Sequence, residues 1–185
     1  YERAMTDLIP VPSRLYFAPP NDLKPLSGKR VAVKDIYNIR GLKTSMCCKS
    51  YEACHGESSQ TADAIQKLLD LGAVIVAKAK TVQLASGLGP RDWIDYQCPF
   101  NPRGDGYLTP DCSSTGSAAG MAAYDWLDFS IGSDSMYFLM ESLRSAIKQI
   151  SGLGSMVGPA AANGIFGLRP TQGALPLGGS LLVST

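Results

Sequence analysis

The chain has 185 residues, of which 45% are hydrophobic and 18% charged, with a formal net charge of +1. This composition is ordinary for a globular domain with one core, and a near-zero charge without a basic run disfavours a nucleic-acid-binding protein. No apolar run approaches the roughly 18 residues of a membrane span and no signal peptide opens the chain, so we expect a cytoplasmic protein without membrane attachment.

The cysteines and glycines exclude two further classes of protein. The five cysteines are odd in number and lack the spacing of zinc motifs, which favours reduced thiols over a disulfide framework: Cys47, Cys48, Cys54, Cys98 and Cys112. The nineteen glycines form neither a G-x-x-x-x-G-K-[ST] nor a G-x-G-x-x-G motif opening a helix after a strand. A nucleotide-binding protein is therefore disfavoured, and we expect no cofactor and no metal.

The first third of the chain predicts a buried strand and an amphipathic helix, preceded by an extended segment. Residues 1–27 are rich in proline and predict an extended lead-in with one short strand near 15–17. Val31–Val33 is a β-branched run that predicts a buried strand ending at Lys34. Residues 35–56 predict a loop with short strands. Apolar residues at helical spacing then predict an amphipathic helix: Ala64, Ile65, Leu68, Leu69 and Leu71, with Thr61 or Ser59 as N-cap and Gly72 as its stop.

The continuation completes an α/β pattern. Residues 73–77 form an apolar run that predicts a strand buried on both faces, and strand, helix and strand make a parallel crossover unit. A short helix or turn is expected over 80–87, a loop over 87–110, a second helix over 115–124 and another buried strand over 126–131. We therefore expect an α/β fold, with a mixed, largely parallel β-sheet flanked by helices.

Serines and small residues are concentrated between 111 and 173, in DCSSTGSAAG, in IGSDS and in GSMVGPAAANGIFGLRPTQG. Such runs let backbone approach a reacting group closely, and they favour a catalytic serine site. The only histidine, His55, lies in a polar loop without a partner motif and is expected to be a surface residue. A Ser-His-Asp arrangement is thus disfavoured.

A lysine could replace histidine as the base if it were neutral. Lys34 follows an apolar strand, where burial would lower its pKa by several units from about 10.4. The strand pattern alone also allows the opposite arrangement, in which Lys34 reaches into solvent beside Asp35.

Four segments in this order resemble the amidase signature family of serine hydrolases: VAVKD, SSTGSAAG, IGSDS and the glycine-rich run from Gly154 to Gly173. The resemblance implies hydrolysis of linear carboxylic amides, other than peptide bonds, through an acyl-serine intermediate with a Ser-Ser-Lys triad. The family's domain is more than twice as long, so residues 28–185 are expected to be a partial catalytic domain that lacks the C-terminal half.

The resemblance also implies a role for particular residues. Ser155 would be the nucleophile, Ser113 the relay serine after a cis peptide bond, and Lys34 the base. Supporting residues would be Ser114, Ser133 and Asp134, and the oxyanion hole would be formed by Leu153, Gly154 and Ser155. Taken without the resemblance, the serine pair at 113–114 could merely cap a helix, and 154–155 could be a plain turn.

Three departures from the family pattern bear on activity. Asp111 and Cys112 replace two glycines before the serine pair, and Val157 replaces an arginine that usually pairs with the aspartate, so Asp134 is expected to be solvated or protonated. The largest departure is spacing: Asp134 and Ser155 are 21 positions apart, against four in the family, which places seventeen extra residues within 136–153.

The insert has two explanations. Leu139, Leu143, Ile147 and Ile150 share one helical face, as in an amphipathic helix. Alternatively, seventeen codons are 51 nucleotides, near the size of a short intron that was translated in frame.

Three functions remain possible from the sequence. The first is an amidase acting on a small-molecule amide; the alternatives are a catalytically inactive fragment or pseudoenzyme, and a protein like the A subunit of an amidotransferase. The sequence makes no prediction of oligomeric state.

Overall fold

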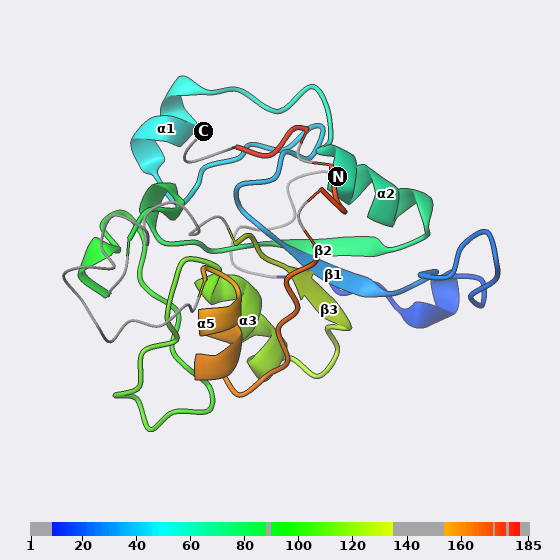
Figure 1. The fold of residues 1–185 in the computed structure, drawn as a ribbon. Helices are drawn as coiled ribbons and strands as arrows, with labels where there is room; N and C mark the ends of the chain where they lie inside the picture. The colour runs from blue at the N-terminus through cyan, green and yellow to red at the C-terminus, as the bar shows by residue number, and fades with distance from the viewer. Residues whose placement is uncertain (1–8, 88–89, 135–153, 172, 177, 182–185) are drawn as a thin grey trace.

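A computed structural model of the chain describes residues 9–87, 90–134, 154–171, 173–176 and 178–181. Its centre is a three-stranded parallel sheet in the order β2-β1-β3 (Figure 1). The strands are β1 (Arg30–Lys34), β2 (Val74–Ala79) and β3 (Phe129–Ile131). Helix α2 (Asp63–Asp70) covers one face, and α3 (Thr115–Ala123) covers the other. The predicted α/β fold is confirmed, and the described strands are all parallel apart from an antiparallel bridge between Tyr37 and Ser180.

The two faces of β1 have different neighbours. Val31 and Val33 pack with Ile65 of α2, whereas Ala32 lies in the cluster that includes Met121 of α3. Because side chains alternate along a strand, Lys34 shares the face of Ala32 and is directed to the side of the sheet where α3 begins.

The first crossover unit follows the predicted order, with β1 and β2 parallel on either side of α2. Neither predicted N-cap is correct: α2 follows Ala62, because the hydroxyl of Thr61 instead accepts a hydrogen bond from the Arg40 N–H at 3.1 Å. Gly72 after the helix has a φ of +94°, which favours glycine and explains why the helix stops there.

The second half of the predicted pattern is also confirmed, with shifted boundaries. Helix α3 begins at Thr115 as expected, but the strand predicted over 126–131 is limited to β3. The reason is a turn over residues 124–127, in which the Leu127 N–H donates to Tyr124 O. Pairing with β1 begins only at the next residue, where the Asp128 N–H donates to Arg30 O. Val76 and Ala79 of β2 are buried while its other residues are half-buried, and β3 is half-buried throughout, so neither strand is as buried as expected.

Two predictions of short strands are wrong. Residues near 15–17 form a 3-10 turn, η1 (Arg14–Tyr16), because Ser13 Oγ accepts from the Leu15 N–H. The lead-in then attaches to the sheet through Arg14, whose guanidinium lies 2.7 Å from the Asp128 carboxylate. The loop over 35–56 contains helix α1 (Lys49–Cys54) instead of short strands.

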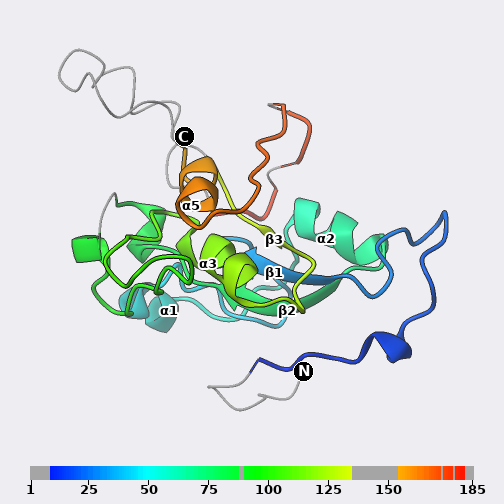
Figure 2. The same cartoon turned by 90° about the horizontal axis from the view of Figure 1, so that it is seen from below.

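Three short helices complete the described chain. η2 (Gln83–Ala85) confirms the predicted helix or turn, and η3 (Pro90–Asp92) lies within the predicted loop. Helix α5 (Val157–Ala162) was not predicted and lies beside α3 (Figures 1 and 2). The insert and its predicted helix lie outside the described residues.

The five cysteines are free thiols. Across the parts of the chain that the structure describes, no helix has the length and apolarity needed to cross a bilayer.

Candidate active site

Lys34 lies at the end of β1 and has no solvent-exposed surface. Its Nζ is 2.7 Å from Ser113 Oγ and 2.7 Å from Ser133 Oγ. These three side chains come from β1, from the loop before α3 and from the loop after β3. Lys34 is therefore buried as predicted, and the alternative of a solvent-exposed lysine is wrong.

The environment of Lys34 keeps much of its amine neutral. Burial lowers the pKa of Lys34 from 10.5 to about 7, although the Asp134 carboxylate and then Cys112 act in the opposite direction. Near neutral pH a large fraction of this amine therefore has a free lone pair, which a general base requires.

Ser113 follows a cis peptide bond from Cys112, as the family resemblance implied. Its carbonyl accepts a hydrogen bond of 2.9 Å from the buried hydroxyl of Thr81, just beyond β2. Sequence reasoning missed Thr81. The available signal was its place after a parallel strand, because the carboxyl ends of parallel strands meet at one edge of the sheet.

Ser114 binds backbone and makes no hydrogen bond with the lysine. Its Oγ accepts from the N–H of Ser133 at 3.1 Å and lies 3.2 Å from Ser133 O, and its own N–H donates to Ser155 O at 2.9 Å. Ser114 occupies the N-cap position of α3, but its side chain makes no capping hydrogen bond. The serine pair is thus more than a helix cap.

Ser155 is buried, with 7% of its surface exposed, and precedes α5 by two residues. Within the described chain, its hydroxyl makes no hydrogen bond with Ser113 Oγ, so the two segments are joined by the backbone contact from Ser114. Also within that part, the N–H groups of Gly154 and Ser155 donate to no acceptor, and Leu153 lies outside the described residues.

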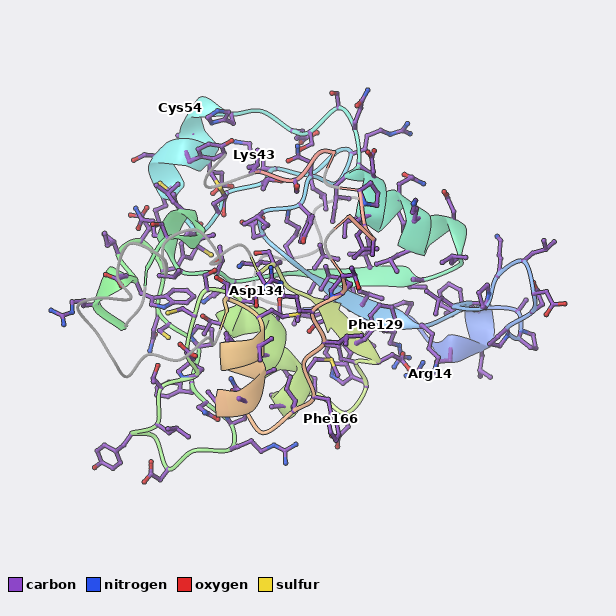
Figure 3. The ribbon with its side chains drawn as sticks, viewed as in Figure 1. Arg14, Lys43, Cys54, Phe129, Asp134 and Phe166 are labelled. Carbon is purple, nitrogen blue, oxygen red and sulfur yellow. The ribbon has the colours of Figure 1, made fainter. Side chains whose placement is uncertain are left out.

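Asp134 is half-buried and lies next to the start of the segment that leads into α5 (Figure 3). Its Oδ2 accepts from the Met156 N–H at 3.4 Å, and its carboxylate fills the space that a Cβ at Gly154 would need. Without the arginine, the half-buried carboxylate of Asp134 packs against the backbone before α5 and keeps part of its exposure to solvent. Asp134 and Gly154, which flank the insert in sequence, consequently lie together.

The replacements for the two glycines fit the turn. Asp111 has a φ of +59°, a left-handed conformation that glycine adopts freely and aspartate tolerates. Its Oδ1 accepts from the Cys112 N–H at 2.8 Å, and its carbonyl accepts from Thr115 Oγ1 at 2.7 Å. Burial raises the pKa of the Cys112 thiol to about 12, so this thiol stays protonated and does not compete as a nucleophile.

His55 is an exposed residue stacked on Tyr51, with ring centroids 3.8 Å apart, which confirms its expected surface position. Among the described residues, no group of three or more His, Cys, Asp or Glu side chains is arranged to hold a metal ion.

Comparison with known proteins gives consistent matches. The family model described as Amidase matches residues 14–135 and stops where the insert begins. Amidase 1 of Oryza sativa subsp. japonica is 32% identical over 155 residues, covering 84% of this chain and 31% of its own length. The A subunit of glutamyl-tRNA(Gln) amidotransferase from Deinococcus deserti is 36% identical over 149 residues, covering 80% and 26%.

Among solved structures, native peptide amidase from Stenotrophomonas maltophilia superposes with a TM-score of 0.64 at 27% identity. The match covers 86% of this chain and 29% of that one. The chain thus spans only 26 to 31% of the length of these relatives. Because the family model covers well over half of the sequence, this chain belongs to the amidase signature family.

Proposed function

We propose that the protein is an amidase-type hydrolase that cleaves small linear amides with Lys34, Ser113 and Ser155. The observation that carries the proposal is the fully buried Lys34 amine, 2.7 Å from Ser113 Oγ and with a pKa of about 7. An amide is a poor electrophile, so a serine must lose its proton as it attacks. A buried neutral amine beside a serine hydroxyl supports such a proton transfer.

In the first step, Ser155 Oγ attacks the amide carbon while its proton passes to Ser113 Oγ and the Ser113 proton passes to Lys34 Nζ. The resulting oxyanion needs fixed donors, and the N–H groups of Gly154 and Ser155 have no acceptor among the described residues. Each such donor contributes about 3 kcal/mol to barrier lowering.

Collapse of this intermediate breaks the C–N bond. The proton on Lys34 returns through Ser113 to the leaving nitrogen, and an acyl-serine remains. Water then attacks the acyl carbon and gives its proton to the same relay, which releases the carboxylic acid and restores Ser155. The hydroxyls of Ser113 and Ser155 must come within hydrogen-bond distance in this cycle, a contact that substrate binding commonly tightens.

Two alternative functions are each favoured by a specific observation. The missing hydrogen bond between the two hydroxyls and the replacement of the arginine by Val157 favour an inactive member of the family. The similarity to the A subunit of an amidotransferase favours a protein that passes the released ammonia to an acceptor.

A fluorophosphonate probe tests the proposal directly, because attack by Ser155 forms an O–P bond and expels fluoride. We expect the recombinant chain to be labelled at Ser155, as located by peptide mass spectrometry, and to release amine or ammonia from a panel of small amides. Ser155→Ala and Lys34→Ala should each abolish both signals. Wild-type protein that is folded but neither labelled nor active would show an inactive member of the family.

A further inference from the structure

The position of Ser155 cannot be set by its covalent connection to the sheet. In sequence, Asp134 and Gly154 are 20 positions apart, against three at the family's spacing. A connection of this length constrains its two ends weakly, because closing a loop costs only slightly more as the loop grows. Side-chain and backbone contacts made after Gly154 must therefore hold the nucleophile near the relay serine.

Asn163 makes one of these contacts. It ends α5, and its surface is fully buried. Its Nδ2 donates to Pro110 O at 3.0 Å and to Pro159 O at 2.8 Å. Pro110 lies three residues before Ser113, and Pro159 lies four residues after Ser155. One amide group thus joins the segment of the relay serine to the helix that follows the nucleophile.

The other end of the Asn163 amide has no partner. Among buried side-chain nitrogen and oxygen atoms of the described residues, only Asn163 Oδ1 and Arg30 Nε lack a hydrogen bond. A buried, unpaired amide oxygen is destabilising, and an apolar side chain of similar volume would avoid that cost. The two N–H donors are therefore the feature that makes asparagine useful at this position.

Three further contacts run in parallel with the Asn163 contact. The Met156 N–H donates to Asp134 Oδ2 at 3.4 Å, at the end of the segment that follows β3. Asn101 Nδ2 donates to Ala162 O at 2.7 Å, which attaches the preceding loop to the end of α5. The Ser114 N–H donates to Ser155 O at 2.9 Å. This last hydrogen bond joins the two serine segments themselves. The Asn163 contact joins the same two segments a few residues away, because Pro110 precedes Ser114 and Asn163 follows Ser155.

We propose that Asn163 is a positioning residue that sets the distance between Ser113 Oγ and Ser155 Oγ. This inference rests on the proposed function of the two serines. Asn163 makes no hydrogen bond with Lys34, Ser113 Oγ or Ser133, so the proton affinity of the base does not depend on it.

The experiment compares wild-type chain with Asn163→Ala and with Ile65→Val. The control removes one methylene from the core between the sheet and α2, on the face away from α3. For each protein, the rate of fluorophosphonate labelling at Ser155 is measured against pH, and exchange of the Ser114 amide hydrogen is followed by mass spectrometry or NMR.

We expect Asn163→Ala to label about 10- to 100-fold more slowly, because a small displacement of reacting groups has effects of this size. The pH midpoint should remain near 7, since Lys34 is undisturbed, and the Ser114 amide should exchange faster. Ile65→Val should keep the wild-type rate and exchange. Wild-type labelling and exchange in Asn163→Ala, or an equal loss in Ile65→Val, would overturn the inference.

Failure of the proposed function would look different. In that case the wild-type chain is not labelled at all, and amide exchange alone decides the role of Asn163. Faster exchange of Ser114 in Asn163→Ala supports its positioning role, whereas unchanged exchange contradicts it.

Discussion

The two halves of the proposed relay are held by different means. On one side, Lys34 ends a strand with a parallel neighbour on each edge, and its amine lies 2.7 Å from two serine hydroxyls. On the other side, Ser155 lies outside the sheet, before a short helix, and reaches the relay segment through the Ser114 backbone and Asn163.

This difference separates two requirements of catalysis. The proposed base, Lys34, is held by burial and by its place on a strand paired on both edges. The proposed nucleophile, Ser155, depends on a few contacts between loops, and the departures at Val157 and in the insert both lie near it in sequence. We therefore expect substitution of Lys34 to abolish activity, and substitutions near Ser155 to raise or lower activity by smaller factors.

The largest expected effect is loss of the base. Lys34→Met should slow Ser155 labelling by at least about 1,000-fold, because general-base catalysis and an activated nucleophile are lost together. Lys80→Met provides the control. Lys80 is an exposed lysine just beyond β2, and its replacement should leave the labelling rate unchanged. Comparable rates in wild type and Lys34→Met would remove Lys34 from the mechanism.

The next effect concerns the insert. Deleting residues 136–152 restores the family's four-position spacing between Asp134 and Ser155. We expect labelling to rise about tenfold, because a shorter connection restricts the nucleophile further. A variant with these residues replaced by a glycine-serine linker of equal length should keep the wild-type rate.

The deletion variant and the transcript together address the two explanations of the insert. A folded deletion variant with slower labelling would show that the inserted residues contribute to the site, and sequencing the transcript would decide whether they are encoded in the mature message.

A smaller effect is expected at Val157. Val157→Arg should give the Asp134 carboxylate a cationic partner and raise the free energy of unfolding by about 1 kcal/mol, a usual value for a partly exposed pair. Urea denaturation measures it, and adding Asp134→Asn should cancel the gain. An equal gain in the double variant would mean that arginine acts by another contact.

Stability should also depend on pH through Lys34. The pKa of Lys34 is about 7 in the folded chain and about 10.5 when unfolded, so between these values the unfolded state binds more protons. Stability contributed by this group should therefore rise with pH across that window, by at most about 1.4 kcal/mol per unit, and stay constant below it.

The measurement is urea denaturation of wild type and Lys34→Met at pH 7, 8 and 9. The difference between their unfolding free energies should grow in favour of wild type as pH increases. Parallel pH profiles would mean that the amine of Lys34 keeps its ordinary pKa in the folded protein.

Hydrophobic pattern was sufficient to predict the sheet and the helices that cover it. Val31, Val33 and Ile65 are buried in one cluster, and the apolar run after Gly72 forms β2 beside β1. Helix α1 and the attachment of Arg14 to Asp128 could not be predicted, because they depend on polar contacts between distant segments.

The site shows the same limit. The resemblance indicated Lys34 and Ser113, and the structure brings them to hydrogen-bond distance. That Ser133, and not Ser114, reaches the lysine depends on how the loop after β3 meets the end of β1. The contact of Asn163 with Pro110 spans 53 positions, which neither periodicity nor a local motif can reveal.

The pH dependence of Ser155 labelling tests the central claim most directly, because the probe reports on the nucleophile and its rate reports on the base. If a neutral Lys34 draws the proton from Ser155 through Ser113, the rate should rise with pH to a plateau, with a midpoint near the pKa of about 7. A midpoint near 10, or labelling of a serine other than Ser155, would contradict the account.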